Sequence, residues 1–318
     1  MTEESRREFL KKTGVSVAAV MLPVSAAAGA PPKGLPRRIL GKTGASVSML
    51  AFGCGSRFLM YEDESEAVSV LNRAIDEGIN YLDTAYAYGE GKSEARVGQV
   101  MKVRRSEVFL ATKVPERSRT RDAALREVEG SLKRLQTDHL DLLHIHSLGH
   151  ADDLARIEAK DGALQALLEL RDQKVARHIG MTSHTDGAVM ADAIARHDLD
   201  CVQMAMNPAR AAGFEERALP AALAKNLGVL LMKSTAQEQL LGGGKATAGE
   251  LLRYAWSLPV AAAVVGMPRR EHLEANLEAA RSFTPLSAAE MDALRGRLAP
   301  ARAALEGFFS GHKDAQSA

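Results

Sequence analysis

Eight short apolar runs, separated by loops and amphipathic segments, constrain the fold of this chain more than any other feature of its sequence. Between the runs, apolar residues recur with helical spacing, as in residues 65–77 and 121–135. Strand, helix and strand in this order predict a parallel sheet, and eight such units in about 250 residues match a closed (β/α)8 barrel. The runs are residues 48–52, 79–82, 108–112, 140–145, 176–181, 201–205, 228–232 and 261–265.

An open, doubly wound sheet is the alternative for the same alternation. Such a sheet normally carries a GxGxxG turn after its first strand, and Gly53 and Gly55 supply only the first two glycines. A short hairpin with turn residues 41–44 precedes the first barrel strand. We therefore predict an α/β chain with one (β/α)8 barrel over residues 37–300, an N-terminal hairpin and a C-terminal helical extension that ends in a tail at residues 301–318.

The amino terminus has the pattern of an export signal. The segment SRREFLK, which begins at Ser5, resembles the twin-arginine signal at every defined position, and an apolar stretch of small residues follows it. Gly14 and Pro23 interrupt that stretch, which falls short of the ~20 apolar residues of a bilayer span. We predict a signal peptide at residues 1–30, a spacer at 31–36, no stable membrane span, and export to the periplasm by the twin-arginine machinery. A disordered basic tail on a cytoplasmic protein is the alternative.

Charge and cysteine content exclude several classes of function. Residues 1–42 hold eight of the 41 basic and three of the 40 acidic residues, so the remaining 33 basic and 37 acidic residues carry a net charge of −4. This part of the chain therefore lacks the excess of basic residues that is typical of nucleic-acid-binding proteins. Cys54 and Cys201 lack the spacing of a disulfide framework or a zinc site, and we predict two free thiols. The acidic loop at 147–161 offers no clear ligand set, so no metal is predicted.

Four reactive side chains fall where predicted strands end, and in such barrels chemistry belongs at that face. They are Asp83, Tyr88, Lys113 and His146. Buried charges on Lys113 and Asp83 would need to pair with one another. If both point at the Tyr88 hydroxyl, the pair creates a proton donor, because a neighbouring ammonium favours the phenolate. His144 lies deeper in the same strand as His146, and we interpret it as a hydrogen-bonded packing residue.

The motifs around these residues resemble those of the aldo-keto reductase family over nearly all of residues 37–300. The family's Asp-Thr-Ala strand end, its Tyr-Gly-x-Gly-x-Ser-Glu loop, its Thr-Lys strand end and its Asp-x-x-x-x-His strand occur here in the same order, at residues 83–85, 88–94, 112–113 and 141–146. The resemblance implies reduction of an aldehyde or ketone to an alcohol by hydride transfer from a nicotinamide cofactor. By that resemblance Tyr88 is the general acid, and Lys113 and Asp83 adjust the acidity of its hydroxyl. His146 orients the carbonyl of a small-molecule substrate.

The resemblance also implies a set of cofactor-binding residues. His184 stands where the family usually has asparagine, Met232 where it often has an aromatic ring, and Ala275 where it usually has glutamate. Arg269 and Arg270 stand at the start of a predicted helix, and their guanidinium groups can donate paired hydrogen bonds to a 2′-phosphate. Such a contact favours NADP(H) over NAD. Solvated arginines in a first helical turn are the alternative. The implied set is Ser183, His184, Gln203, Met232, Lys233, Ser234, Gly266, Met267, Arg269, Arg270 and Asn276.

The substrate pocket is less defined by sequence. In the family its walls come from loops after strands 1, 2 and 4 and from the carboxyl-terminal tail, and here those segments hold the candidate walls Tyr61, Tyr86, Phe308 and Phe309. These side chains do not identify the substrate. Neither the direction of the reaction nor the oligomeric state follows from them. Two other classes of function stay open. One is a non-catalytic NADP(H)-binding sensor or envelope subunit with the same fold, and the other is a scaffold protein that binds no nucleotide.

Overall fold

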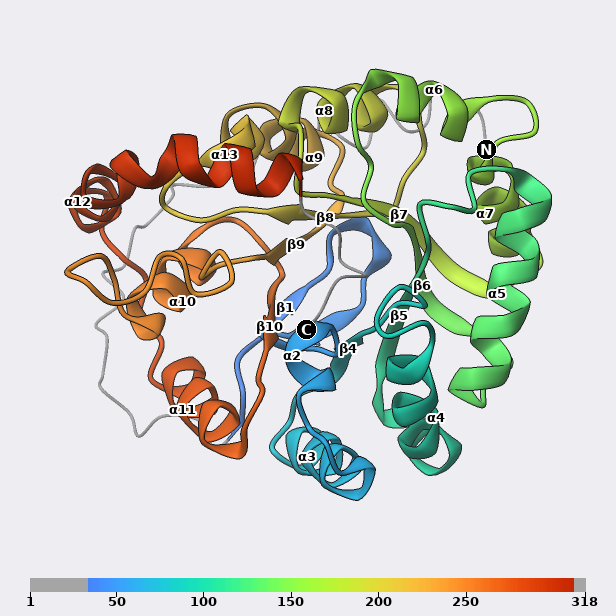
Figure 1. The fold of residues 1–318 in the computed structure, drawn as a ribbon, viewed down its shortest axis with the longest axis horizontal. Helices are drawn as coiled ribbons and strands as arrows, with labels where there is room; N and C mark the ends of the chain where they lie inside the picture. Colours follow the sequence, from blue (N-terminus) through green and yellow to red (C-terminus); the bar gives the residue numbers. More distant parts are fainter. Residues whose placement is uncertain (1–33, 312–318) are drawn as a thin grey trace, which may run out of the picture. The chain divides into compact units, whose positions relative to one another are not determined.

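The computed structural model describes residues 34–311, so the predicted signal peptide, part of the spacer and the end of the tail lie outside the described residues. Eight parallel strands close into a barrel in sequence order, and the last strand pairs with the first (Figure 1). All eight predicted runs form barrel strands. They are β3 (Leu50–Gly53), β4 (Tyr81–Asp83), β5 (Phe109–Val114), β6 (Leu140–Ile145), β7 (Ala176–Ser183), β8 (Cys201–Ala205), β9 (Gly228–Met232) and β10 (Ala262–Gly266).

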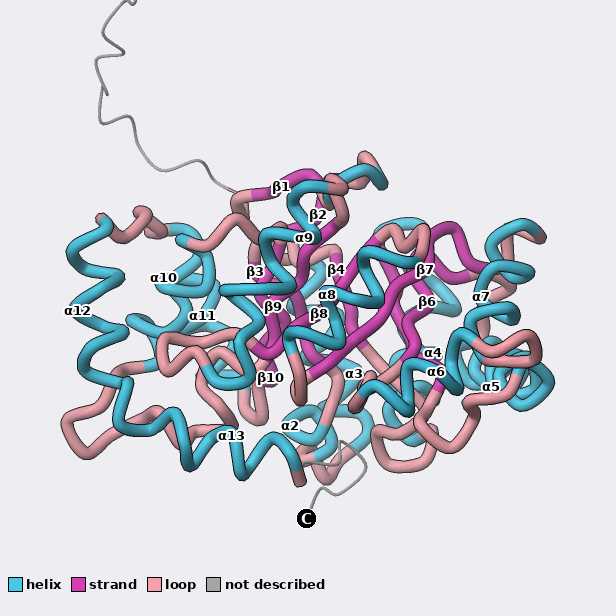
Figure 2. Tube along the Cα trace, turned by 90° about the horizontal axis from the view of Figure 1, so that it is seen from above, coloured by secondary structure: helices cyan, strands magenta, loops and turns pink. Residues whose placement is uncertain are grey.

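Helices surround the barrel and connect its strands (Figure 2). The longest, α5, begins after Thr120, whose hydroxyl accepts from the Ala123 amide, and its buried positions Ala124, Val128 and Leu135 lie on one face. The helices are α2 (Ser56–Leu59), α3 (Glu64–Asp76), α4 (Lys92–Arg104), α5 (Arg121–Leu135), α6 (Ala151–Glu158), α7 (Ala163–Asp172), α8 (Gly187–Arg196), α9 (Leu219–Ala224), α10 (Ala248–Ser257), α11 (Arg270–Arg281), α12 (Ala288–Leu298) and α13 (Arg302–Ser310), with short turns η1 (Gly41–Thr43), η2 (Arg105–Glu107), η3 (Ala211–Gly213), η4 (Phe214–Ala218) and η5 (Ala299–Ala301).

The predicted hairpin closes the end of the barrel where the strands begin. Strands β1 (Arg37–Ile39) and β2 (Ser46–Ser48) pair antiparallel across η1. Gly41 has a φ of 49°, and a Cβ at this position would lie 2.3 Å from the carbonyl carbon of Leu227. Only glycine fits this close approach, which brings the turn against the start of β9. Figure 2 shows β1 and β2 at one end of the barrel and α13 at the other.

The barrel interior contains two layers of different character. The lower layer, here called the barrel floor, is an apolar cluster beneath the strand ends, and the upper layer holds Asp83, Lys113, His146 and Gln203. A second, larger apolar core lies between the barrel and its helices. The buried members of the floor are Leu40, Val47, Ala51, Tyr81, Ala111, Leu142, Cys201, Leu230, Ala261 and Ala262.

Two further predictions concern the thiols and the membrane. Cys54 and Cys201 are both buried and both free, as their spacing predicts, and burial raises the pKa of each thiol well above its ordinary value. Among the helices of residues 34–311, none combines the length and the apolar character that a bilayer crossing requires.

Candidate active site

The structure joins the predicted Asp83, Lys113 and Tyr88 into one cluster. The Nζ of Lys113 lies 2.6 Å from Oδ1 of Asp83 and 3.2 Å from the hydroxyl oxygen of Tyr88. It also donates to the carbonyl oxygen of Thr84 at 2.8 Å. Lys113 is 1% exposed, so its charge is taken out of water and compensated by a carboxylate. The pairing that the sequence predicts is confirmed.

Strand register brings these groups together. Asp83 pairs with Ala111 across β4 and β5, and Lys113 projects from the same face of β5 two residues further on. The Thr84 amide donates to the Ala111 carbonyl, and the Thr84 hydroxyl lies 2.8 Å from the hydroxyl of Ser93 on α4. These contacts hold the Thr84 carbonyl toward the ammonium group of Lys113.

His146 completes the cluster at the end of β6. Its ring lies edge-on to the ring of Tyr88, with centroids 5.6 Å apart and planes at 85°. Both rings are buried, and Tyr88 keeps 8% of its surface exposed. The four residues therefore lie around one point at the mouth of the barrel, and their catalytic roles remain predictions.

His144 departs from its predicted state. The residue is fully buried as expected, but neither ring nitrogen has a hydrogen-bond partner among residues 34–311, so the prediction of a hydrogen-bonded residue is wrong. The reason lies in the register: one strand neighbour is Gly180, which has no side chain, and the other is Lys113, whose ammonium group is directed to Asp83, Thr84 and Tyr88 instead. Burial lowers the pKa of His144 well below its ordinary value, and the charges of Lys113 and His146 lower it further.

A cavity of about 750 Å³ opens above this cluster. Its wall includes Gly53 at the end of β3, Gly55 just after that strand, the side chain of Met60, and the loop that follows β9. Met60 is 52% exposed, which is unusual for a large apolar residue and gives the cavity an apolar rim. The predicted site residues that line the cavity are Asp83, Tyr88, Gln203, Met232, Lys233, Ser234, Gly266, Arg269 and Asn276.

Four predicted cofactor residues lie outside the cavity lining. Ser183 is buried and donates its hydroxyl to the Leu148 carbonyl at 2.7 Å, and His184 is buried beside it. Met267 packs in the core. Arg270 turns away from the cavity and donates to the Ser69 hydroxyl on α3 at 2.9 Å. The structure thus places one arginine of the predicted pair, Arg269, at the cavity wall.

The predicted pocket walls Tyr61, Tyr86, Phe308 and Phe309 do not line this cavity. Tyr61 packs in the core, where burial raises the pKa of its hydroxyl to about 12. The ring of Tyr86 lies between the guanidinium groups of Arg117 and Arg134, at 4.1 and 4.7 Å, beside a separate cavity of about 420 Å³. Phe309 is a buried residue of α13, and Phe308 contacts its ring. The sequence indicates which loop a residue belongs to but not where its side chain points.

Sequence reasoning also missed residues of the cavity wall. Arg57 on α2 and Glu238 in the loop after β9 both line the cavity, and their side chains form an ion pair of 3.0 Å. His272 lies in the first turn of α11 on the same wall. The position of Arg57 directly after the first barrel strand is a signal that could have identified it. Glu238 carries no such signal, because its loop has no motif.

Comparison with known proteins assigns this barrel to a class. The sequence model of the aldo/keto reductase family matches residues 50–251, which run from β3 into α10. The chain therefore belongs to the aldo/keto reductase family. The matched segment stops before β10 and α11, so the loop that carries Arg269 lies outside it.

Individual relatives agree with this assignment. The chain is 32% identical over 161 residues to the uncharacterized oxidoreductase YqkF of Bacillus subtilis, an alignment that covers 46% of this chain and 48% of that protein. The chain thus spans about half the length of this curated relative. An aldo-keto reductase from Bacillus halodurans, solved in its holo form, is 26% identical, covers 83% of this chain and 96% of its own, and has a TM-score of 0.70. An aldo-keto reductase from Klebsiella pneumoniae solved with NADPH shares the fold, with 24% identity, coverage of 89% and 97%, and a TM-score of 0.67.

Proposed function

We propose that this protein is an NADPH-dependent oxidoreductase that reduces an aldehyde or ketone to an alcohol, with Tyr88 as the general acid. One observation carries the proposal: a buried ammonium on Lys113 bridges the Asp83 carboxylate and the Tyr88 hydroxyl at the base of a 750 Å³ cavity. A tyrosine hydroxyl beside a buried ammonium is a poised proton donor, because the phenolate left after donation faces a positive charge.

The residues of the cavity fit a nicotinamide cofactor. Gln203 lines the wall, and its buried Oε1 has no hydrogen-bond partner within residues 34–311, which suits an amide group of a ligand. Gly266 exposes its backbone on the wall, and the Arg57 side chain approaches it closely, since a Cβ at Gly266 would lie 2.8 Å from the Arg57 Cβ. Arg269 is the N-cap of α11, whose first amides lack acceptors inside the helix, so this end suits a phosphate.

The roles of the chain's own residues follow from this arrangement. When bound, the cofactor supplies the hydride. Tyr88 donates its hydroxyl proton to the carbonyl oxygen of the substrate, and Lys113 stabilises the resulting phenolate. Asp83 compensates the charge of the Lys113 ammonium group and holds it in place. His146, edge-on to Tyr88, orients the carbonyl oxygen toward the donated proton.

Turnover and binding distinguish this function from a non-catalytic one. We expect steady-state oxidation of NADPH with at least one member of a panel of aldehydes and ketones, and quenching of protein or NADPH fluorescence on binding. Binding of NADPH without turnover across the panel would assign the chain to a nucleotide-sensing role. Absence of binding would leave a scaffold role.

We further propose that the chain is exported in its folded state. The proposal rests on SRREFLK at the amino terminus, and on a cavity whose wall combines residues of β8, β9 and β10 and so exists only after folding. Cofactor loading would then take place in the cytoplasm. Replacing Arg6 and Arg7 by lysine should retain an unprocessed precursor in the cytoplasm. Cell fractionation with amino-terminal sequencing tests this, and a wild-type chain found only in the cytoplasm with residues 1–30 intact would contradict it.

A further inference from the structure

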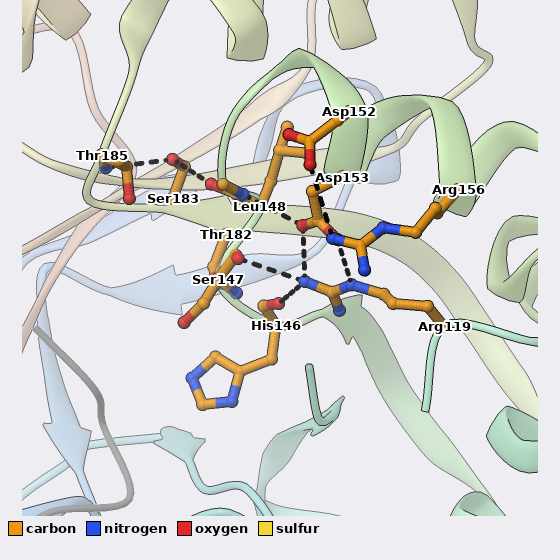
Figure 3. A network of polar contacts seen from close by, with 11 residues as sticks. Arg119, His146, Ser147, Leu148, Asp152, Asp153, Arg156, Thr182, Ser183 and Thr185 are labelled. Carbon is orange, nitrogen blue, oxygen red and sulfur yellow. Dashed lines mark hydrogen bonds and ion pairs between the residues drawn. The ribbon is translucent and has the colours of Figure 1, made fainter. Parts of the chain in front are cut away.

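A buried ion pair beside His146 takes no part in the proposed proton transfer. Arg119, in the loop after β5, is 8% exposed, and its Nε and Nη2 each lie 2.9 Å from a carboxylate oxygen of Asp153 on α6. The same Nη2 donates to the carbonyl oxygen of His146 at 2.8 Å and to that of Ser147 at 3.1 Å (Figure 3). One guanidinium group therefore connects the β5 loop, the end of β6 and α6.

Strand β7 holds the same segment from the other side. The Ser147 amide donates to Oγ1 of Thr182 at 2.8 Å, and the Leu148 amide donates to the Thr182 carbonyl at 2.7 Å. Ser183 then donates its hydroxyl to the Leu148 carbonyl. Ser147 has a φ of 50°, in the left-handed region that residues other than glycine seldom adopt. The backbone directly after His146 is thus held in an unfavourable conformation by contacts from two sides.

Asp153 is well suited to hold the guanidinium group in place. Its carboxylate also accepts from the Gly149 amide at 3.1 Å. Burial raises the pKa of Asp153, but the hydrogen bonds and charge of Arg119 outweigh burial and keep that pKa below its ordinary value. The pair is therefore ionised at neutral pH, which gives charge-assisted hydrogen bonds with fixed geometry.

We propose that Arg119, held by Asp153, is a positioning residue that sets the place of His146 for the reaction. The inference rests on the proposed function, because it assigns a purpose to the position of His146. Arg119 acts only through the backbone of His146 and Ser147, and its side chain does not line the 750 Å³ cavity. A misplacement of about 1 Å at a reacting centre can cost about 10²-fold in rate, so loss of the pair should lower kcat by that order.

The test compares two paired replacements. Arg119→Met combined with Asp153→Leu removes both charges, which avoids leaving one of them buried alone. Arg121→Met combined with Glu169→Leu is the matched control, since this partly exposed ion pair lies just after Arg119 and no contact joins it to the His146 backbone in the described structure. We expect similar denaturation midpoints, a loss of about 10²-fold in kcat for the first pair, and an unchanged kcat for the control.

A double-mutant cycle then separates positioning from general damage. In a His146→Ala background, the change at Arg119 and Asp153 should lower kcat less than twofold, because the group that the pair positions is already gone. Equal losses in the two backgrounds would overturn the inference. If the paired variant does not fold, Arg119→Lys provides the second test in the same cycle, since lysine keeps the charge but cannot donate in the fixed fork that the carboxylate and the carbonyls require.

A crystal structure of the soluble variant gives a readout that does not depend on activity. We expect the backbone of residues 146–148 and the ring of His146 to move by about 1 Å while β5 and β6 stay in place. An unmoved His146 would overturn the inference even if kcat falls. If wild-type protein reduces no carbonyl, the proposed function fails, and the crystal comparison still decides whether Arg119 positions His146.

Discussion

The two layers of the barrel interior differ in how their buried polar groups are accommodated inside a closed sheet. In the upper layer, Lys113 has three oxygen partners, and one of them is the carboxylate of Asp83. Just below it, both ring nitrogens of His144 and the hydroxyl of Tyr81 have no hydrogen-bond partner within residues 34–311. The upper layer thus carries charge, and the lower layer keeps its polar groups neutral.

The position of each layer along the strands explains the difference. At the strand ends, loop residues such as Thr84 and Tyr88 add acceptors from outside the sheet, so an ammonium group can be surrounded. On the floor, side-chain contacts come from other strands and from the hairpin, and these are mostly apolar. A charge without partners is strongly destabilising there. We conclude that the loops, and not the strands alone, allow a charged group to be buried at one end of the barrel.

The largest expected effect is on catalysis in the upper layer. Tyr88→Phe removes the donated proton, and because positioned acid catalysis contributes about 10² to 10⁴ in rate, kcat should fall by that order while NADPH binding persists. Tyr86→Phe is the matched control on the same loop, because phenylalanine keeps the ring between Arg117 and Arg134. Steady-state kinetics and fluorescence titration measure both. A Tyr88→Phe enzyme with more than a tenth of the wild-type kcat would refute the role.

The second effect is on stability. Lys113→Met leaves the buried Asp83 carboxylate without its ammonium partner, and we expect the free energy of unfolding to fall by about 3 to 5 kcal/mol. The control is Lys133→Met, which removes an exposed lysine that pairs with Glu129 within α5 and should cost no more than about 0.5 kcal/mol. Urea denaturation of apo protein compares them. Equal losses for the two variants would show that the Asp83–Lys113 pair contributes no more than a surface contact.

The third effect separates the two arginines at the start of α11. Arg269 lines the cavity, whereas Arg270 donates to Ser69 outside it. Arg269→Ala should weaken NADPH binding by about 1.5 to 3 kcal/mol and leave NADH binding nearly unchanged, because one charge-assisted hydrogen bond to a 2′-phosphate is lost. Arg270→Ala is the control and should change neither affinity. Equal weakening of both nucleotides by Arg269→Ala would place the 2′-phosphate elsewhere.

The smallest effect concerns the buried His144 and the pH dependence of stability. The folded state depresses the pKa of His144 below its ordinary value of 6.5, so below that value the unfolded chain binds more protons and stability falls as pH falls. Between pH 6.5 and 5.0 this single group should therefore lower the free energy of unfolding. We expect His144→Leu to remove that part of the loss, whereas a variant of the exposed His150 to glutamine retains it. Urea denaturation at both pH values measures the difference, and identical pH slopes for wild type and His144→Leu would contradict the assignment.

Sequence alone predicted the fold and the meeting of Asp83, Lys113 and Tyr88 because both depend on local patterns. Short apolar runs define barrel strands, and residues at strand ends meet at one face, so the sequence pattern is enough to place Asp83, Lys113 and Tyr88 together. The state of His144 depended on its neighbours in two adjacent strands, and Gly180 lies 36 residues away. Arg119 and Asp153 meet across 34 residues without a shared motif. Side-chain direction at loops, as for Tyr86 and Arg270, is set by packing that no periodicity encodes.

The most direct test of the proposed function measures the transfer of deuterium from NADPH to the product. Purified protein is incubated with an aldehyde that supports turnover and with NADPH deuterated at the transferable position of the nicotinamide C4, and the product is analysed by mass spectrometry. Hydride transfer in the cavity above Tyr88 predicts an alcohol with one deuterium on its carbinol carbon, and a Tyr88→Phe enzyme should form this product about 10² to 10⁴ times more slowly. An alcohol without deuterium, or no alcohol from any carbonyl in the panel, would contradict the assignment of this barrel as a carbonyl reductase.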